Sequence, residues 1–174
     1  VYSHPQMMMT LQAPDEASLA QYIEENAQSI IDFFTKSEMN REINNLREQH
    51  NPMVSNLAKE LLGVDIWVPF EVDNYKKGKD FLWASTNTGK KDMSIVLYSY
   101  PYTDKNTFTL EYFLNKRDSV MKVNIPGGPE GSYMTTQRDY VYVKDATVHG
   151  KYAQVARGLW RVQGDRMGGP FVSH

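Results

Sequence analysis

Three tyrosines alternate with other residues in the stretch VLYSYPYTD, residues 96–104, and this spacing is suited to binding. If the stretch is one β-strand, Tyr98, Tyr100 and Tyr102 project from one face at steps of about 6.6 Å, because alternate strand residues share a face. Such a row offers flat apolar area with hydroxyl tips, which suits a sugar or a peptide. Aromatic residues also commonly pack against a neighbouring strand or under a helix, and this structural interpretation is the stronger one.

A second candidate is the stretch ARGLWRVQGD, residues 156–165. In a strand, Arg157 and Arg161 share one face with Leu159, while Trp160 lies on the other face. Two guanidinium groups about 13 Å apart on a sheet can hold carboxylates or phosphates. More often such arginines pair with nearby acids, here Asp139 or Asp165, as a device of the fold. The candidate binding residues are therefore Tyr98, Tyr100, Tyr102, Arg157, Trp160 and Arg161.

Catalysis would need carboxylates that act as general acid and base. The most available are Asp104, Asp118, Asp139 and Asp165, with the two arginines holding the substrate. Glycoside cleavage requires two of them about 5 to 9.5 Å apart in a cleft. The sequence contains no motif that selects any of them, so the catalytic residues stay unknown.

Several other chemistries are excluded or disfavoured. The chain has no cysteine, which excludes disulfides, thiolate nucleophiles and cysteine-ligated zinc. The four histidines, at positions 4, 50, 149 and 174, have no metal-ligand spacing. The glycine-rich IPGGPEGS, residues 125–132, follows a helical pattern and lacks a Lys-Ser/Thr pair, so it indicates a turn and not a phosphate loop. We predict no metal and no organic cofactor.

Composition limits the partners. The 174 residues carry a net charge of -2, which gives no electrostatic reason to expect nucleic acid or an anionic membrane as a partner. No apolar run is long enough to span a bilayer. Residues 15–50 carry eight acidic against three basic side chains, as a solvent-facing helix would. The length suits one domain over residues 1–174.

The pattern of apolar residues predicts the elements. We expect a strand at 6–12 and a helix at 15–49, kinked near 35–37, that buries Leu19, Ile23, Ile30 and Phe34 against a sheet. A helix at 52–62 starts at an Asn-Pro cap. Strands follow within 64–70, 80–86 and 93–102, separated by turns at 74–79 and 87–91. A helix at about 109–121 precedes strands within 140–162, with a turn near His149.

This order, β-αα-βββ-α-ββ, predicts an α+β fold with an antiparallel sheet and helices packed mainly on one face. The apolar residues Phe171 and Val172 come very late in the chain. We expect them to begin a further strand that lies beside another, because an isolated strand leaves its backbone groups unpaired. We also expect the natural protein to continue beyond His174.

Three blocks of this sequence resemble the signature blocks of an uncharacterised Bacteroidetes family of exported lipoproteins, classed as a domain of unknown function. The blocks are YSYPYTDKNTFTLEYFLNKRDSVMK, PGGPEGSYMTTQ and GKYAQVARGLWRVQGDRMGGPF, and the resemblance extends from about residue 5 to the end. It implies a signal peptide and a lipid-carrying cysteine upstream of Val1, and a location in the cell envelope. The family pattern continues past GGPF with a strand, a hairpin and a helix. No catalytic residue is carried over.

Two functions follow as expectations. The first is a non-catalytic, lipid-anchored binding or assembly module whose partner is an unknown envelope ligand or protein. It would touch the membrane only through its upstream anchor and would not bind nucleic acid. The alternative is a hydrolase or transferase acting on an envelope glycan or peptide.

Overall fold

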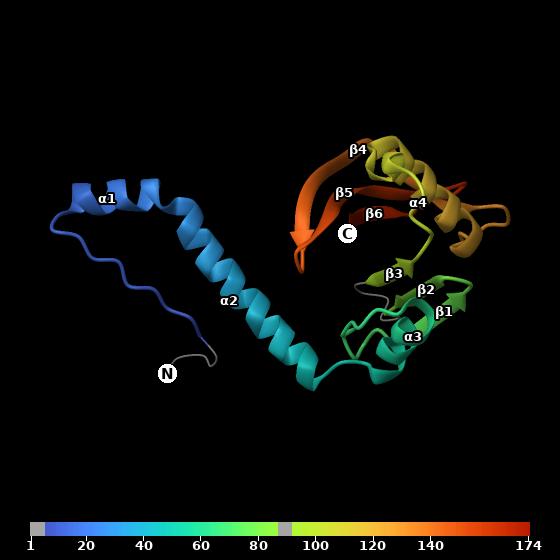
Figure 1. Ribbon diagram of the computed structural model, residues 1–174, viewed down its shortest axis with the longest axis horizontal. Helices are drawn as coiled ribbons and strands as arrows, with labels where there is room; N and C mark the ends of the chain where they lie inside the picture. The colour runs from blue at the N-terminus through green and yellow to red at the C-terminus, as the bar shows by residue number, and fades with distance from the viewer. Residues whose placement is uncertain (1–5, 87–91) are drawn as a thin grey trace. The chain divides into compact units, whose positions relative to one another are not determined.

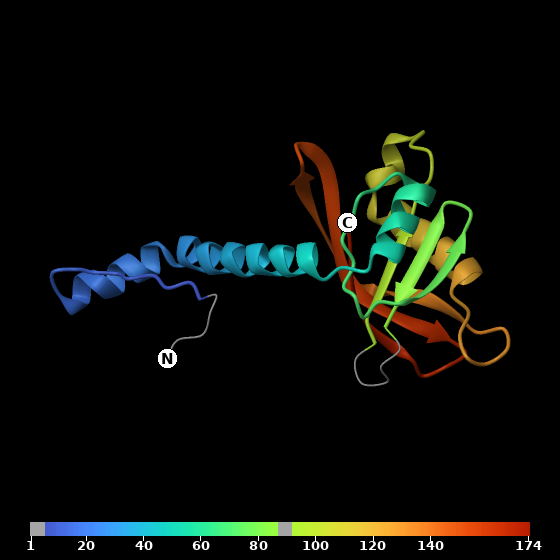
Figure 2. The ribbon, with the colours of Figure 1, turned by 90° about the horizontal axis from the view of Figure 1, so that it is seen from below.

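The computed structural model describes residues 6–86 and 92–174, and it confirms the α+β class. The chain divides into two compact units, Val1–Ser99 and Tyr100–His174, each with a three-stranded antiparallel sheet (Figures 1 and 2). The expected order of helical and strand segments after residue 15 is confirmed. The expectation of one sheet is wrong, because the strands are divided between two separate sheets. The single domain expected from the length stays a prediction, and the turn expected at 87–91 lies outside the described residues.

The first expected strand is absent. Residues 6–12 form no regular element, and Met7 and Met8 within them are exposed. An apolar run becomes a strand only where a neighbouring strand can take its backbone hydrogen bonds. Residues 6–12 have no such neighbour among the described strands.

The long helix expected at 15–49 is two helices, α1 (Glu16–Glu25) and α2 (Ala27–Glu48), which we call the helical arm. Asp15 caps α1 by accepting a hydrogen bond from Ser18 N. The helix is interrupted at Asn26, and α2 then continues as regular helix through residues 35–37, where a kink was expected. Neither helix has a buried residue, so the prediction that the apolar stripe packs on a sheet is wrong.

The first sheet has the order β1-β2-β3, formed by Asn74–Gly78, Phe81–Ser85 and Ser94–Tyr98. Helix α3 (Pro52–Leu62) begins at Asn51, whose side chain accepts from the backbone of residues 53 and 54. The Asn51 amide also donates to Val72 O, so one buried side chain fixes both the helix start and a loop. Helix α3 ends at Gly63, which has the left-handed φ of 68° that favours glycine.

The core of this unit lies between α3 and β2. It consists of the fully buried Val54, Ala58, Val68, Val72, Leu82 and Ala84. Val68 comes from the segment 64–70, where we expected a strand, and Val72 comes from the residues that follow this segment. That segment is an irregular loop, and the strand lies instead at the expected turn, 74–78. A lysine-bearing, exposed strand is typical of a sheet edge, which explains why its composition resembled a turn.

The second unit begins with a short 3-10 helix, η1 (Lys105–Phe108), and helix α4 (Leu110–Asn124). Its sheet has the order β4-β5-β6, formed by Tyr133–Val148, Lys151–Gln163 and Gly168–Ser173. Helix α4 packs on one face of this sheet, burying Leu114, Arg117 and Met121 (Figure 1). The expected further strand is confirmed, because residues 171–173 pair with residues 156–158 of β5.

A bulge interrupts the pairing of β4 with β5. Gln137 pairs with Leu159 and Tyr142 pairs with Arg157, so the four residues 138–141 stand opposite Gly158 alone. A Cβ at Gly158 would lie 2.8 Å from Tyr140 O and 2.9 Å from Val141 Cγ2. Glycine therefore suits this site, since it lets the bulged backbone approach β5 closely.

Candidate binding surface

The expected row of three tyrosines does not form. Strand β3 ends at Tyr98, and Tyr100 and Tyr102 follow in irregular backbone. The alternation that would place all three on one face needs a continuous strand, and Pro101, which has no backbone N–H to donate to a sheet, lies between Tyr100 and Tyr102. The prediction of one shared tyrosine face is wrong.

Tyr100 packs against α4. Its ring centroid lies 6.0 Å from that of Tyr112, and Lys116 Nζ lies 4.6 Å from the Tyr100 centroid. Partial burial, and then the neighbouring Tyr112, raise the pKa of Tyr100 above its ordinary value. These contacts anchor the segment after β3 to α4. Packing under a helix is the structural interpretation that the sequence allowed for the tyrosines.

Tyr102 belongs to a different cluster. Its ring lies 5.6 Å from Phe108 in η1, which meets Tyr152 of β5 edge to face at 4.9 Å. The Gln154 side-chain amide donates to Phe108 O, and the Tyr152 hydroxyl donates to Asp145. The bond to Asp145 raises the pKa of Tyr152, because losing the proton would place two negative charges together. The cluster holds η1 to the outer part of the β4-β5 hairpin.

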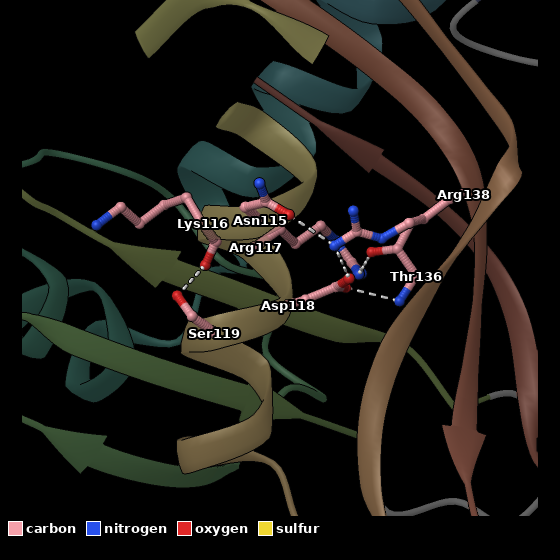
Figure 3. A network of polar contacts seen from close by, with 7 residues as sticks. All are labelled: Asn115, Lys116, Arg117, Asp118, Ser119, Thr136 and Arg138. Carbon is pink, nitrogen blue, oxygen red and sulfur yellow. Dashed lines mark hydrogen bonds and ion pairs between the residues drawn. The ribbon is translucent and has the colours of Figure 1, made fainter. Parts of the chain in front are cut away.

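A polar network joins α4 to β4, and sequence patterns did not reveal it (Figure 3). Arg117 is only 5% exposed and donates to Thr136 Oγ1 at 2.7 Å, and its guanidinium carbon lies 4.0 Å from the Phe171 ring centroid. Asp118 accepts from Thr136 N and from Arg138, which also donates to Asn115. The one available signal was an arginine at an inward position of α4, between Leu114 and Met121.

The face of the second sheet away from α4 is the strongest candidate for binding. Arg157 and Arg161 project from it together with Leu159, which confirms the expected side of β5. Thr136, whose hydroxyl contacts α4, pairs with Trp160, so Trp160 lies on the helix-facing side. The structure thus separates Trp160 from the two arginines. We call the face of the second sheet away from α4, which carries Arg157, Leu159 and Arg161, the open face.

Strand register assigns two further cations to the open face. Lys144 of β4 and Lys151 of β5 share its alternation, and both are exposed like the arginines. Exposed apolar side chains lie between them: Tyr142 is 77% and Val172 58% exposed, and these two flank Arg157 in one cross-strand row. No paired residue of these three strands, all of them described, puts an acidic side chain on this face. Asp139 lies in the bulge, outside the paired register.

Comparison with known families decides what the chain is related to. Residues 51–174 match a domain of unknown function, DUF4837. The chain belongs to the DUF4837 family. Residues 1–47 match a second domain of unknown function, DUF8532. No curated protein and no solved structure matches the chain.

The two matches divide the elements cleanly. The DUF4837 segment contains α3, both sheets and α4, while the DUF8532 segment contains α1 and all but the last residue of α2. Neither description assigns an activity. The function of the DUF4837 segment must therefore be argued from the chemistry of its surfaces, of which the open face is the most distinctive.

The four candidate acids of the DUF4837 segment have mostly local partners. Asp104 caps η1 by accepting from Asn106 N, Asp118 belongs to the α4-β4 network, and Asp165 accepts from Arg166 N in the turn before β6. Asp139 is exposed in the bulge. Hydrogen bonds of this kind position backbone, and they engage the oxygens that an acid or base would need.

Residues 6–86 and 92–174 offer neither a metal-ligand cluster nor a membrane-spanning helix. No group of three or more His, Asp or Glu side chains there is arranged to hold a metal ion. No helix in those ranges is long and apolar enough to cross a membrane. The absence of a metal and of an organic cofactor stays a prediction.

Proposed function

We propose that this DUF4837 protein is a non-catalytic binding or assembly module that contacts its partner through the open face. The observation that carries the proposal is the combination of four cations with exposed Tyr142, Leu159 and Val172 on strands fixed by backbone pairing. Arginine beside exposed aromatic and apolar side chains is typical of the residues that contribute most to protein interfaces. The partner would be an acidic surface with apolar residues.

The alternative, a hydrolase or transferase, has no observation in its favour. Its candidate acids Asp104, Asp118 and Asp165 lie in three separate local arrangements, an η1 cap, a helix-strand network and a turn. A cleavage reaction needs two carboxyl groups that converge on one substrate atom. We therefore retain binding as the function.

The cell-envelope location belongs to the same proposal and rests on the three sequence blocks that resemble exported lipoproteins. In cells that make the native protein from its own gene, we expect a clickable fatty acid to label it. We also expect the label and the protein to enter the membrane fraction together. An unlabelled native protein in the soluble fraction would remove the location from the proposal and leave the binding surface untouched.

The binding surface is tested by capture of partners from solubilised native membranes. The Arg157→Glu/Arg161→Glu variant should lose at least nine-tenths of the material that the wild type captures specifically, because it reverses the charge at the centre of the open face. The matched control is Lys79→Glu/Lys105→Glu, which changes net charge equally at two exposed lysines outside that face. Equal loss in both variants would indicate a bulk charge effect and refute the open face as the binding site.

A further inference from the structure

The helical arm carries exposed apolar side chains that no other described element buries. Helices α1 and α2 bury no residue, and Ile31 and Met39 of α2 are 57% and 59% exposed, with Phe33, Phe34 and Ile43 also exposed. Helices in proteins gain most of their stability by packing an apolar face and not from propensity alone. The arm therefore lacks the partner that its sequence is built to meet.

The arm is also strongly acidic. Residues 16–48 contain seven acidic and three basic side chains, a net charge of -4. Within the arm one ion pair joins Arg41 to Glu38, while Asp32 and Glu42 are exposed on α2. An acidic helix with apolar residues is the chemical complement of a basic sheet with apolar residues.

The open face fits the arm in charge and in length. Its four cations, Lys144, Lys151, Arg157 and Arg161, balance the net charge of the arm, and register puts no acid among them. Helix α2 has 22 residues and is about 33 Å long. Strand β5 has 13 residues and is about 43 Å long, so the sheet can accept the whole of α2.

The contacts at the end of the arm leave its stripe available. Arg47 lies 5.7 Å from the Trp67 ring centroid, and His50 contacts Leu46 O and the same tryptophan ring. These contacts engage the last turn of α2, while the exposed apolar residues of the arm lie before it: Ile23, Ile31, Phe33, Phe34, Met39 and Ile43.

We propose that the open face binds the helical arm of a second copy of this chain, and that the exchange is reciprocal, so that two chains form a symmetric dimer. Both surfaces occur on every chain, so a two-fold dimer uses each of them twice and leaves neither uncovered. The arm supplies acidic and apolar side chains, and the open face supplies the cations, Tyr142 and Val172. The inference rests on the proposed function, because it names the partner of the same face.

The test uses the whole chain and two charge-reversed variants. One variant is Arg157→Glu/Arg161→Glu, in the open face, and the other is Asp32→Lys/Glu42→Lys, in the arm. In sedimentation velocity at low salt, we expect the wild type to have twice the 20.0 kDa chain mass. Each variant alone should be monomeric, with a dissociation constant raised at least tenfold, and the Lys79→Glu/Lys105→Glu control should stay dimeric.

Mixing the two variants gives the sharpest result. Each arm then meets an open face of opposite charge in the other variant, so the equimolar mixture should recover the dimer mass. Circular dichroism of each variant shows whether it is folded, and the recovered dimer proves the same, since misfolded chains would not complement each other.

Other outcomes overturn the inference. A dimeric face variant would show that the dimer does not use the open face, and a monomeric wild type would show that no second copy binds. If the monomeric wild type still captures a native partner through Arg157 and Arg161, or binds anionic vesicles through them, the dimer is refuted while the proposed binding function stands. If the wild type is a dimer and captures no native partner, the inference stands and the external partner is removed from the proposed function.

Discussion

Replacing Gly127 with alanine should lower the free energy of unfolding by about 3 kcal/mol, because the loop after α4 has no room for a methyl group. A Cβ at Gly127 would lie 2.6 Å from Val162 Cγ1 and 2.8 Å from Ser132 Cβ, and closer still to Ser132 Oγ. Gly127 N also donates to Ser132 O, so the loop backbone cannot simply move away. Urea denaturation followed by circular dichroism measures the change.

The neighbouring glycine is the matched control for this prediction. A Cβ at Gly128 would meet only Asp165 Oδ2, at 3.8 Å, which is ordinary contact. Gly128→Ala should therefore be neutral or slightly stabilising, because alanine restricts the unfolded chain. Equal stability of the two variants would mean that the turn at 126–132 is not packed against β5 as described.

Truncating Leu82 to alanine should cost about 3 kcal/mol in the first unit. Leu82 is 1% exposed and lies among Val54, Ala58, Val68 and Val72, so its removal leaves a cavity that these residues cannot fill. Hydrogen exchange read by mass spectrometry should show lost protection in peptides from α3 and β2. Met53→Ala, in α3 at a side chain that is 47% exposed, should change protection little. A Leu82→Ala variant as stable as the Met53→Ala variant would contradict the assignment of the core.

Sequence patterns predicted the helices better than the strands. The Asn51-Pro52 cap and Gly63 mark both ends of α3, because helix ends depend on local backbone chemistry. Strand β1 was missed because Lys76 and Lys77 resemble turn residues, and an edge strand has little need of apolar side chains. The loop at 64–70 resembled a strand because it is rich in apolar residues, of which Val68 is fully buried.

The placement of the candidate residues on strand faces was predicted in part. Alternation correctly placed Arg157 and Arg161 on one face and Trp160 on the other, because β5 is regular throughout. The same alternation failed for Tyr100 and Tyr102, because nothing in a short pattern says where a strand ends. Lys144 could not be assigned to the open face from sequence, since its side depends on the pairing register with β5, which the structure reveals.

What packs against the apolar face of the helical arm was the hardest property to predict. The stripe of Ile23, Ile30 and Phe34 was correctly identified as amphipathic helix, and periodicity then suggested burial in the chain's own core. Periodicity reports that an apolar face exists and does not report what covers it. The exposed arm is the case in which the two differ.

The bulge at residues 138–141 separates two parts of β4 that differ in phase. Before it, Thr136 faces α4, and after it the residues on that side are Val143 and Asp145, while Tyr142 and Lys144 face away. The side of Lys144 is fixed from the other end of the hairpin, where Val148 pairs with Lys151 across the turn at 149–150. A residue lost or gained within 138–141 would therefore alter the bulge and leave Lys144 on the open face, so this stretch can vary in length without reversing the charge of that surface.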